Sequence, residues 1–525
     1  MARTVLSQLG QHWHLPLLLV VTLLVFSPGL LNPAFVYDDA QLLVNNPTLA
    51  SLSKLFSGDL WAGVPGAGHQ RDYYRPGVLF SFFLDRAVFG EDAFGFRLHS
   101  LALHLLAVSL LWTLGKHWCL SNRALFAGVG LFAVHPAQVE GVVFLAARND
   151  VQALCALLAV LLLLRVPTAG RLAGAAVLIA LGTLCKESLF LAPLAYLASA
   201  KAQGQGWGDA RGYVAIFAGL GLALLARMLV GVGFPHGALD LSVLPGAWGG
   251  WSRSVLWPLG LAPGAHAGFD PIPWGPAVAG LLLIGGLIWG GGGWGLLLGA
   301  ALLIPALGGV GTTGLVADRY LYGALAGLGL SLAAVVRRTP SLERPSMAVP
   351  MLGLLTIPTA ANWDSDLILW SQAVLSHSNP YTHGAYAKAL YDAGDPASAL
   401  TQARLATQGP VYAHSCYNVV PWALEVEGPQ GAVRTGKSAI QAGCGRPPEL
   451  VCPLALSHAL LGDWLEAEEY ALSMEQDPTG LCVVVRAAAA LRVSDEKAFA
   501  SEAKPGASLE QLREQAEWLI EAAGG

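Results

Sequence analysis

The stretch LPLLLVVTLLVFSPGLL, residues 15–31, is followed closely by FVYDD, residues 35–39. The first part is an apolar run close to the ~20 residues that a membrane-spanning helix needs. The second part places the adjacent carboxylates of Asp38 and Asp39 at the end of that helix. Charges next to a bilayer are costly and usually functional. The pair therefore predicts either a catalytic site at this end of the helix or an acidic turn that caps the next helix.

The composition is that of a polytopic membrane protein, which makes the lipid bilayer a partner. Of 525 residues, 54% are hydrophobic and only 12% are charged, whereas soluble domains are about 25% charged. The net charge of −5 and the lack of a basic run argue against a nucleic-acid partner. No small-residue cleavage site follows the first apolar run, which favours an uncleaved signal-anchor helix over a signal peptide.

Apolar runs predict an all-α bundle of about eleven membrane spans within residues 1–362. The spans are expected at 15–31, 98–115, 122–135, 150–165, 171–185, 188–200, 213–232, 275–290, 293–310, 320–336 and 346–361. Several are shorter than the ~20 residues of a simple span, as expected where helices line a cavity. Residues 80–89 predict an amphipathic helix in the interface.

Basic residues alternate onto one side of this predicted bundle. They are Arg3, Lys116, Arg123, Arg165, Arg171, Lys201, Arg211, Arg337, Arg338 and Arg344. The positive-inside rule makes that side cytoplasmic, so the long first loop, residues 32–97, faces the periplasm or lumen. The Gly- and Ala-rich composition and short loops indicate a bacterial protein. We therefore expect an inner-membrane protein whose C-terminal domain lies in the periplasm.

The character of the chain changes after residue 362, where apolar spans give way to Ala-rich helical patterns. GDPASA at 394–399 recurs as GDWLEA at 462–467, an offset of twice 34 residues, and GPQGA at 428–432 lies midway. A 34-residue period with glycine turns and small residues is typical of tetratricopeptide repeats. Residues 363–525 are therefore predicted to form an extracytoplasmic domain of three to four helix pairs.

Four cysteines, Cys416, Cys444, Cys452 and Cys482, fall in the predicted repeat domain. In an oxidising compartment they would form two disulfides, with a connectivity that the sequence does not give. Scattered buried thiols are the alternative.

Further charged and polar residues lie in loops predicted on the side of the acidic pair. They are His135, Glu140, Arg148, Asp150, Lys186, Glu187, Asp318, Arg319 and Tyr320, with Arg227 near a predicted helix end. We expect these residues to bind substrate, and the cations among them to stabilise a phosphate.

Plainer interpretations of the same residues stay open. Lys186 and Glu187 would also fit a local helix-end pair, and Asp318-Arg319 an interfacial anchor. His135-Pro136 would fit a helix-terminating turn capped by Glu140, and Asp72 would fit as a partner of Arg75. The acidic and histidine side chains are also types that bind divalent ions, but no tight spacing demands a metal, so no cofactor is assigned.

An ordered set of motifs resembles the transmembrane-and-tetratricopeptide O-mannosyltransferases of the GT-C glycosyltransferase superfamily. The motifs are YDD at 37–39 with NP at 46–47, DYYRP at 72–76, LD at 84–85, FG at 89–90, FAVHPAQVE at 132–140, ARND at 147–150, CKE at 185–187 and ADRYLY at 317–322. The resemblance implies a polyprenyl-phosphate-linked sugar as donor. It also implies a protein or glycolipid hydroxyl as acceptor, on the extracytoplasmic face.

The resemblance also maps the family's paired acidic residues onto Asp38 and Asp39. One carboxylate would act as general base on the acceptor hydroxyl, and direct displacement of the lipid phosphate would invert the anomeric carbon. The competing classes are a non-catalytic membrane scaffold, whose repeats assemble an envelope complex, and a transporter. A transporter would show internal repeats among its spans, and the sequence has none that we detect.

Overall fold

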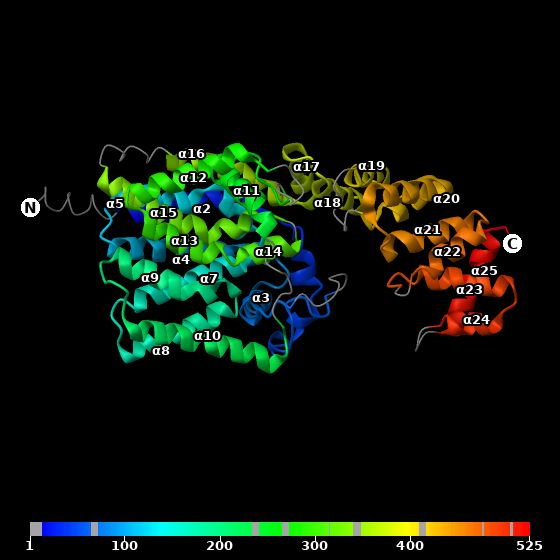
Figure 1. Cartoon of the computed structure of the whole chain (residues 1–525), viewed down its shortest axis with the longest axis horizontal. Helices are drawn as coiled ribbons and strands as arrows, with labels where there is room; N and C mark the ends of the chain where they lie inside the picture. Colours follow the sequence, from blue (N-terminus) through cyan, green and yellow to red (C-terminus); the bar gives the residue numbers. More distant parts are fainter. Residues whose placement is uncertain are drawn as a thin grey trace, which may run out of the picture. The chain divides into compact units, whose positions relative to one another are not determined.

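The computed structural model describes residues 13–64, 72–233, 241–264, 272–313, 315–339, 348–408, 416–474, 477–503 and 508–524. Arg3 and Arg344, used above for orientation, lie outside these ranges. The chain divides into two compact units, Met1–Gln372 and Ala373–Gly525. The regular elements of both units are helices (Figure 1), which confirms the all-α prediction.

Fifteen described α-helices precede residue 362, and most of them run side by side in Figure 1. They are α2 His14–Leu31, α3 Pro76–Phe89, α4 Ala93–His117, α5 Asn122–Val134, α6 Val139–Val143, α7 Arg148–Leu163, α8 Ala169–Thr183, α9 Ala192–Ala202, α10 Ala210–Val230, α11 Leu244–Leu256, α12 Trp274–Trp289, α13 Gly293–Leu303, α14 Ala306–Thr313, α15 Leu321–Arg338 and α16 Ala348–Ala361.

Every predicted span overlaps at least one of these helices, and the predicted interfacial helix is part of α3. Within the described ranges, five helices are long and apolar enough to cross a membrane, and a sixth span is possible if the bent pair α5–α6 counts as one. The protein is therefore an integral membrane protein, and the count of eleven stays a prediction. An α-helix rises 1.5 Å per residue, so a helix as short as α9 is not long enough to cross a ~30 Å hydrocarbon core alone.

Glycines allow α15 to approach two neighbouring helices closely. A Cβ on Gly128 of α5 would lie 2.0 Å from the carbonyl oxygen of Gly329, and one on Gly327 would lie 2.4 Å from the backbone nitrogen of Gly299 in α13. Neither position has room for a larger residue. Small residues at helix contacts are the usual way in which membrane helices pack backbone against backbone.

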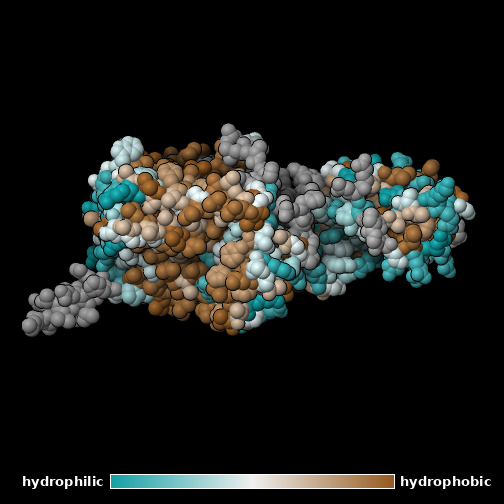
Figure 2. Space-filling model, turned by 90° about the horizontal axis from the view of Figure 1, so that it is seen from below, coloured by the Kyte–Doolittle hydropathy of each residue, from teal (hydrophilic) through white to brown (hydrophobic). Residues whose placement is uncertain are grey.

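The outer surface of the first unit is mainly apolar. Figure 2 shows hydrophobic side chains over most of its visible face, with hydrophilic ones gathered towards the ends. Leu282 is 72% exposed and Trp289 is 93% exposed. Large apolar side chains in contact with solvent in such numbers mark a surface that faces lipid.

Helices of the second unit form successive antiparallel pairs. They are α18 Pro380–Asp392, α19 Pro396–Ala406, α20 Val419–Ala439, α21 Pro448–Leu460, α22 Trp464–Leu472, α23 Leu481–Arg492, α24 Glu496–Ser501 and α25 Leu509–Ala522, preceded by α17 Asp366–Ser376. The predicted turn residues Gly394, Gly428 and Gly462 all have positive φ, at 86°, 72° and 79°. Gly394 connects α18 to α19 and Gly462 connects α21 to α22, each time within a packed helix pair, and Gly428 kinks α20.

Two disulfides lie in this unit, Cys416–Cys444 and Cys452–Cys482. Each joins residues about one repeat apart, at separations of 28 and 30 residues. The sulfur atoms are packed inside two apolar clusters, one around Trp422 and the other around Phe499. The alternative of scattered thiols is therefore wrong for these four cysteines. Assignment of the helix pairs to the tetratricopeptide family stays a prediction.

Candidate active site

The acidic pair lies in a tightly held turn just after α2. Tyr37 has a φ of 64°, which is unusual for a residue with a side chain. Its N–H donates to Asp366 Oδ1 at 2.8 Å. Its ring stacks on the Phe144 ring and meets the Trp370 ring edge-on, with distances between ring centres of 5.1 Å and 5.2 Å. Backbone strain of this kind is maintained only where the surroundings impose it. The turn is therefore fixed immediately before Asp38.

The two neighbouring aspartates have different environments. Asp39 has no exposed surface, and its two oxygens accept the N–H groups of Leu145 at 3.2 Å and Ala146 at 2.9 Å. Burial raises the pKa of Asp39 to about 7, against the lowering effects of Arg97 and of those two N–H groups. Asp38 is only half-buried. Asp39 therefore anchors the turn before α7, and Asp38 is the more accessible carboxylate.

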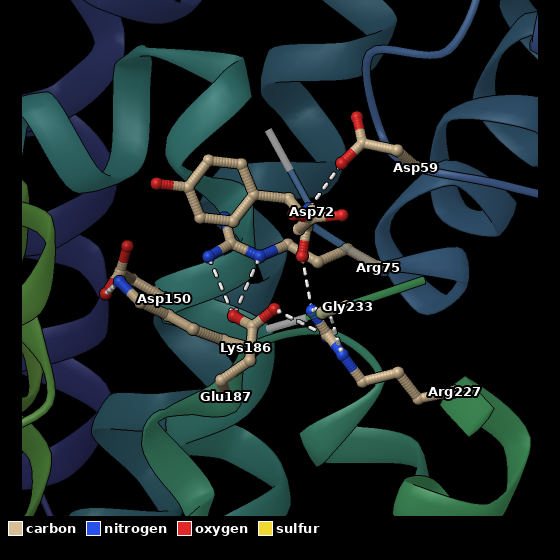
Figure 3. A network of polar contacts seen from close by, with 9 residues as sticks. Asp59, Asp72, Arg75, Asp150, Lys186, Glu187, Arg227 and Gly233 are labelled. Atoms are coloured by element: carbon tan, nitrogen blue, oxygen red, sulfur yellow. Dashed lines mark hydrogen bonds and ion pairs between the residues drawn. The ribbon is translucent and has the colours of Figure 1, made fainter. Parts of the chain in front are cut away.

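Glu187 stands between two arginines (Figure 3). Arg75 donates to Glu187 Oε2 from Nε at 3.0 Å and from Nη2 at 2.8 Å, and Arg227 Nη1 donates to Oε1 at 3.3 Å. Burial alone would raise the pKa of Glu187, but Arg75 and Arg227 outweigh it and hold that pKa below its ordinary value. Arg227 also donates to the carbonyl oxygens of Asp72 and Gly233.

The cations of two more ion pairs lie against the same aromatic ring, that of Tyr320. Lys186 pairs with Asp150, and Arg319 pairs with Glu140. The Lys186 Nζ lies 5.4 Å and the Arg319 Cζ 5.2 Å from the centre of the Tyr320 ring. Cations over an aromatic face gain electrostatic stabilisation. Tyr320 thus connects the two pairs.

The predicted residues that converge come from separate parts of the chain. Glu140 lies in α6, Asp150 in α7, Lys186 and Glu187 directly after α8, Arg227 in the last turn of α10, and Arg319 and Tyr320 in the turn before α15. The ion-paired side chains are 6–20% exposed, so the cluster is largely desolvated but still open. The interpretation of Lys186-Glu187 as a mere local pair is wrong, because each binds a partner distant in sequence.

Arg148 belongs to a different cluster. Its guanidinium has no exposed surface and donates to Ser100 Oγ at 2.9 Å, to the Phe96 carbonyl at 2.6 Å and to Asp85. Asp85 also bonds His99 Nδ1 at 2.6 Å. These contacts join α3, α4 and α7, and no surface is left on which Arg148 could meet a substrate.

His135 fits the plainer interpretation given above. It ends α5, its Nδ1 accepts the Ala137 N–H at 3.1 Å, and its Nε2 lies 3.1 Å from the Val255 carbonyl oxygen. It is 1% exposed. The sequence proposed Glu140 as the cap of this turn, but Glu140 binds Arg319. Asp318 is 7% exposed and lies next to the Arg319 pair.

An apolar cavity of about 580 Å³ lies between α11, α12, α13 and α15. Trp251 of α11 lines it and donates its Nε1–H to the Ala317 carbonyl at 3.3 Å, one residue before Asp318. The cavity therefore approaches the polar cluster at this end. The sequence did not predict α11, because LPGAWGGWSRSVL lacks a long aliphatic run.

A metal site is not formed by the predicted candidates within the described ranges. The group of possible ligands that does come close there is Cys452, Asp477 and Cys482, and its two cysteines are joined in a disulfide. Sequence reasoning also missed Arg75 as a partner of Glu187. The available signal was its place in the DYYRP motif, but its partner lies 112 residues away.

Comparison with known proteins finds similarity over one part of the chain. Residues 76–230 match the family model described as dolichyl-phosphate-mannose-protein mannosyltransferase. This segment includes most of the converging cluster. No solved structure matches.

Individual relatives fall in one group. The chain is 31% identical over 123 residues to the protein O-mannosyl-transferase F38B6.6 of Caenorhabditis elegans, covering 22% of this chain and 18% of that protein. It is 32% identical over 135 residues to Tmtc1 of Drosophila melanogaster (25% and 16% covered) and 32% over 128 residues to human TMTC1 (23% and 14%). The chain thus spans less than a fifth of the length of these curated relatives. Within that range, the resemblance predicted from the motifs is confirmed.

Proposed function

We propose that this protein is a membrane glycosyltransferase that moves a sugar from a polyprenyl-phosphate donor to a hydroxyl of an acceptor protein, with a glycolipid as the alternative acceptor. The observation that carries the proposal is the largely desolvated but still accessible cluster of Arg75, Lys186, Arg227 and Arg319, each held by a carboxylate. Four cations kept in place by partners form a preorganised site for an anionic leaving group.

In this scheme Asp38 is the general base. It accepts the proton of the acceptor hydroxyl while that oxygen bonds to the anomeric carbon. The bond from the anomeric carbon to the phosphate oxygen breaks at the same time, and its electron pair leaves with the lipid phosphate. The configuration of the anomeric carbon is inverted. No protein acid is needed, because the phosphate leaves as an anion. Asp39 acts as a positioning residue, through the N–H groups of Leu145 and Ala146.

The cations around Tyr320 are the proposed contacts of the donor phosphate. Lys186 and Arg319 lie over that ring from separate elements, and Arg75 adds a guanidinium that Glu187 Oε2 holds through Nε and Nη2. A guanidinium has five N–H donors, which also suit phosphate oxygens. Arg148 and His135 are left out of the proposed site, because their polar atoms are satisfied inside the protein.

A lipid-linked donor also fits the cavity next to the cluster. Its lining includes Trp248, Leu283, Leu297 and Leu325, with almost no polar surface. An apolar surface that leads from a lipid-facing bundle to a phosphate site suits a prenyl chain.

We also propose that this end of the bundle and the second unit face an oxidising compartment. Disulfides persist in such compartments and are rare in the cytosol, and the second unit has two of them. An alkaline phosphatase fusion after Gly525 would be active if this orientation holds. Activity only from a cytoplasmic reporter at that position would reverse it.

The enzyme is tested with the purified full chain, radiolabelled polyprenyl-phosphate sugars (mannose first) and a membrane extract as acceptor. Label should enter protein, and Asp38→Asn should lower the rate by about 100-fold or more. The matched control is Glu91→Gln, a carboxylate of the same loop whose side chain is 57% exposed. Transfer at the wild-type rate by Asp38→Asn would remove the assigned base. No transfer of any sugar, with proteins captured through the second unit, would instead favour the scaffold.

A further inference from the structure

The end of the first unit that is remote from Asp38 contains a second polar site. A cavity of about 450 Å³ is lined there by Lys201 at the end of α9, Arg337 and Arg338 at the end of α15, and the glycine run 291–293 before and at the start of α13. Trp118 and Trp294 complete its walls. None of the three cations belongs to the cluster proposed to hold the donor phosphate.

The three cations of this cavity pair with no acidic side chain of the described ranges. Among the residues that the structure describes, Lys201, Arg337 and Arg338 form no ion pair with a carboxylate. Arg337 Nη1 donates to the Trp118 carbonyl at 3.4 Å, Arg338 Nη1 donates to the Gly290 carbonyl at 3.3 Å, and Lys201 lies 4.3 Å from the centre of the Trp207 ring. Each cation therefore keeps donors that no carboxylate satisfies.

Trp118 provides an independent indication of a ligand. The residue is 5% exposed, yet its Nε1–H has no acceptor within the described part of the chain. A buried donor without a partner costs about 1–3 kcal/mol, and Trp usually finds a partner when it is buried. An oxygen atom of a ligand in the cavity would satisfy it.

The local backbone keeps space for that ligand. Gly291 has a φ of 85°, and a Cβ there would lie 1.6 Å from Arg338 Nη1. A side chain at this position would push the guanidinium away. The glycine run thus keeps Arg338 close to the cavity wall.

The apolar cavity described above continues from this site. Ile288, Gly293 and Trp294 line both cavities. A ligand bound at the cations therefore has an apolar surface beside it, as a membrane lipid requires and a free phosphate ion does not. Basic pockets between membrane helices are known to bind lipid head groups.

We propose that the Lys201–Arg337–Arg338 cavity binds the phosphate head group of an anionic phospholipid of the adjoining leaflet, with its acyl chains beginning along Ile288 and Trp294. The phosphate oxygens accept from the three cations and from Trp118 Nε1–H. The residues that bind this phosphate are separate from the cations proposed for the donor phosphate, so the test does not depend on the proposed glycosyl transfer.

The experiment is native mass spectrometry of the purified full chain with phosphatidylglycerol as probe. The wild-type protein should retain phosphatidylglycerol in preference to phosphatidylcholine. The double variant Arg337→Gln, Arg338→Gln should lower that retention about tenfold or more, since each basic residue near a lipid surface contributes about 1 kcal/mol. Both arginines are exposed, so the fold should persist. Trp118→Phe keeps an aromatic side chain but loses the Nε1–H donor together with part of the indole, and should lower retention to a smaller extent.

The control is Arg171→Gln combined with Arg211→Gln, two exposed cations of helix starts outside the cavity lining. It should keep wild-type retention. Equal retention by the wild type and the Arg337–Arg338 variant would overturn the proposal. So would displacement of the lipid by inorganic phosphate, or retention of polyprenyl phosphate in place of phosphatidylglycerol at these residues.

Discussion

The cations at the two ends of the membrane unit differ in burial and in ion pairing. At the end that carries Asp38, the cations Arg75, Lys186, Arg227 and Arg319 each have a carboxylate partner and are at most 20% exposed. At the other end, Arg337 and Arg338 are exposed and, within the described residues, bind no carboxylate. The first arrangement fixes cations in a desolvated site, and the second leaves them available to the membrane surface.

The difference shows what buried charge requires. Removing charges from water costs several kcal/mol per ion, so a cation can be kept in a desolvated site only with partners that also fix its direction. Such fixed cations suit a transition state, where charge appears at one defined atom. Exposed cations need no such partners and act through attraction over about a Debye length.

The largest effect is expected from Lys186→Met, which removes one fixed cation and leaves Asp150 without its partner. We expect a loss of about 100-fold or more in transfer rate, because a preorganised donor at a developing charge contributes on that scale. The matched control is Lys116→Met at the opposite end, which should transfer sugar at the wild-type rate. Equal rates for Lys186→Met and the wild type would show that paired cations at this end do not serve the reaction.

Arg148→Met tests whether Arg148 stabilises the contacts between α3, α4 and α7, in contrast to Lys186, which we place in the donor site. It leaves Asp85 buried without its arginine, which costs about 3–5 kcal/mol. We expect a clear loss of thermal stability and of folded yield, and a smaller loss for Lys186→Met, because the Asp150 left behind is 11% exposed whereas Asp85 is 4% exposed. Thermal unfolding of both variants in the same detergent measures this. An Arg148→Met variant as stable as the wild type would contradict the role of Arg148 in holding these helices together.

Asp39 gives a smaller effect that depends on pH. Its pKa is raised from 3.8 to about 7 by burial, so the folded state holds a proton that the unfolded state releases. The resulting stability is fully present below pH 4 and is lost as the pH rises through about 7. Asp39→Asn should therefore flatten the fall of the unfolding temperature across this range, whereas Glu91→Gln should keep the wild-type slope. An unchanged slope in Asp39→Asn would show that Asp39 does not titrate there.

The smallest effect is expected for Lys116→Met at the basic end. Lys116 is exposed and donates to Asn122 Oδ1 at 2.9 Å. Surface interactions of this kind contribute little, so its unfolding temperature should match that of the wild type. A change in unfolding temperature as large as that of Arg148→Met would mean that exposed cations at this end contribute as much to stability as buried, paired ones at the other.

Sequence patterns predicted much of the fold because apolar runs and glycine periods are local signals. The spans appear as helices, and Gly394 and Gly462 are turns, since a positive φ favours glycine wherever it occurs. By contrast, α11 escaped prediction, because its burial depends on the neighbouring α12 and not on its own composition.

The site was predicted as a set of residues but not as a set of contacts. Charged residues in apolar surroundings stand out in a sequence, which is why Lys186, Glu187 and Arg227 were found. Their pairing was not visible, because Glu187 meets Arg75 across 112 residues. The different environments of Asp38 and Asp39 were equally hidden, since they depend on the turn formed by Leu145 and Ala146.

The contact of Tyr37 with Asp366 decides where this chain can be divided. The sequence suggests a boundary after residue 362, but Asp366 and Trp370, which hold Tyr37 in its left-handed conformation, both lie beyond it. A shortened protein ending at 362 would keep every membrane helix and lose the two residues that hold the turn before Asp38. Asp366 and Trp370 therefore belong with the turn that precedes the proposed base, and a fragment made to test catalysis should extend through Gln372, where the first unit ends.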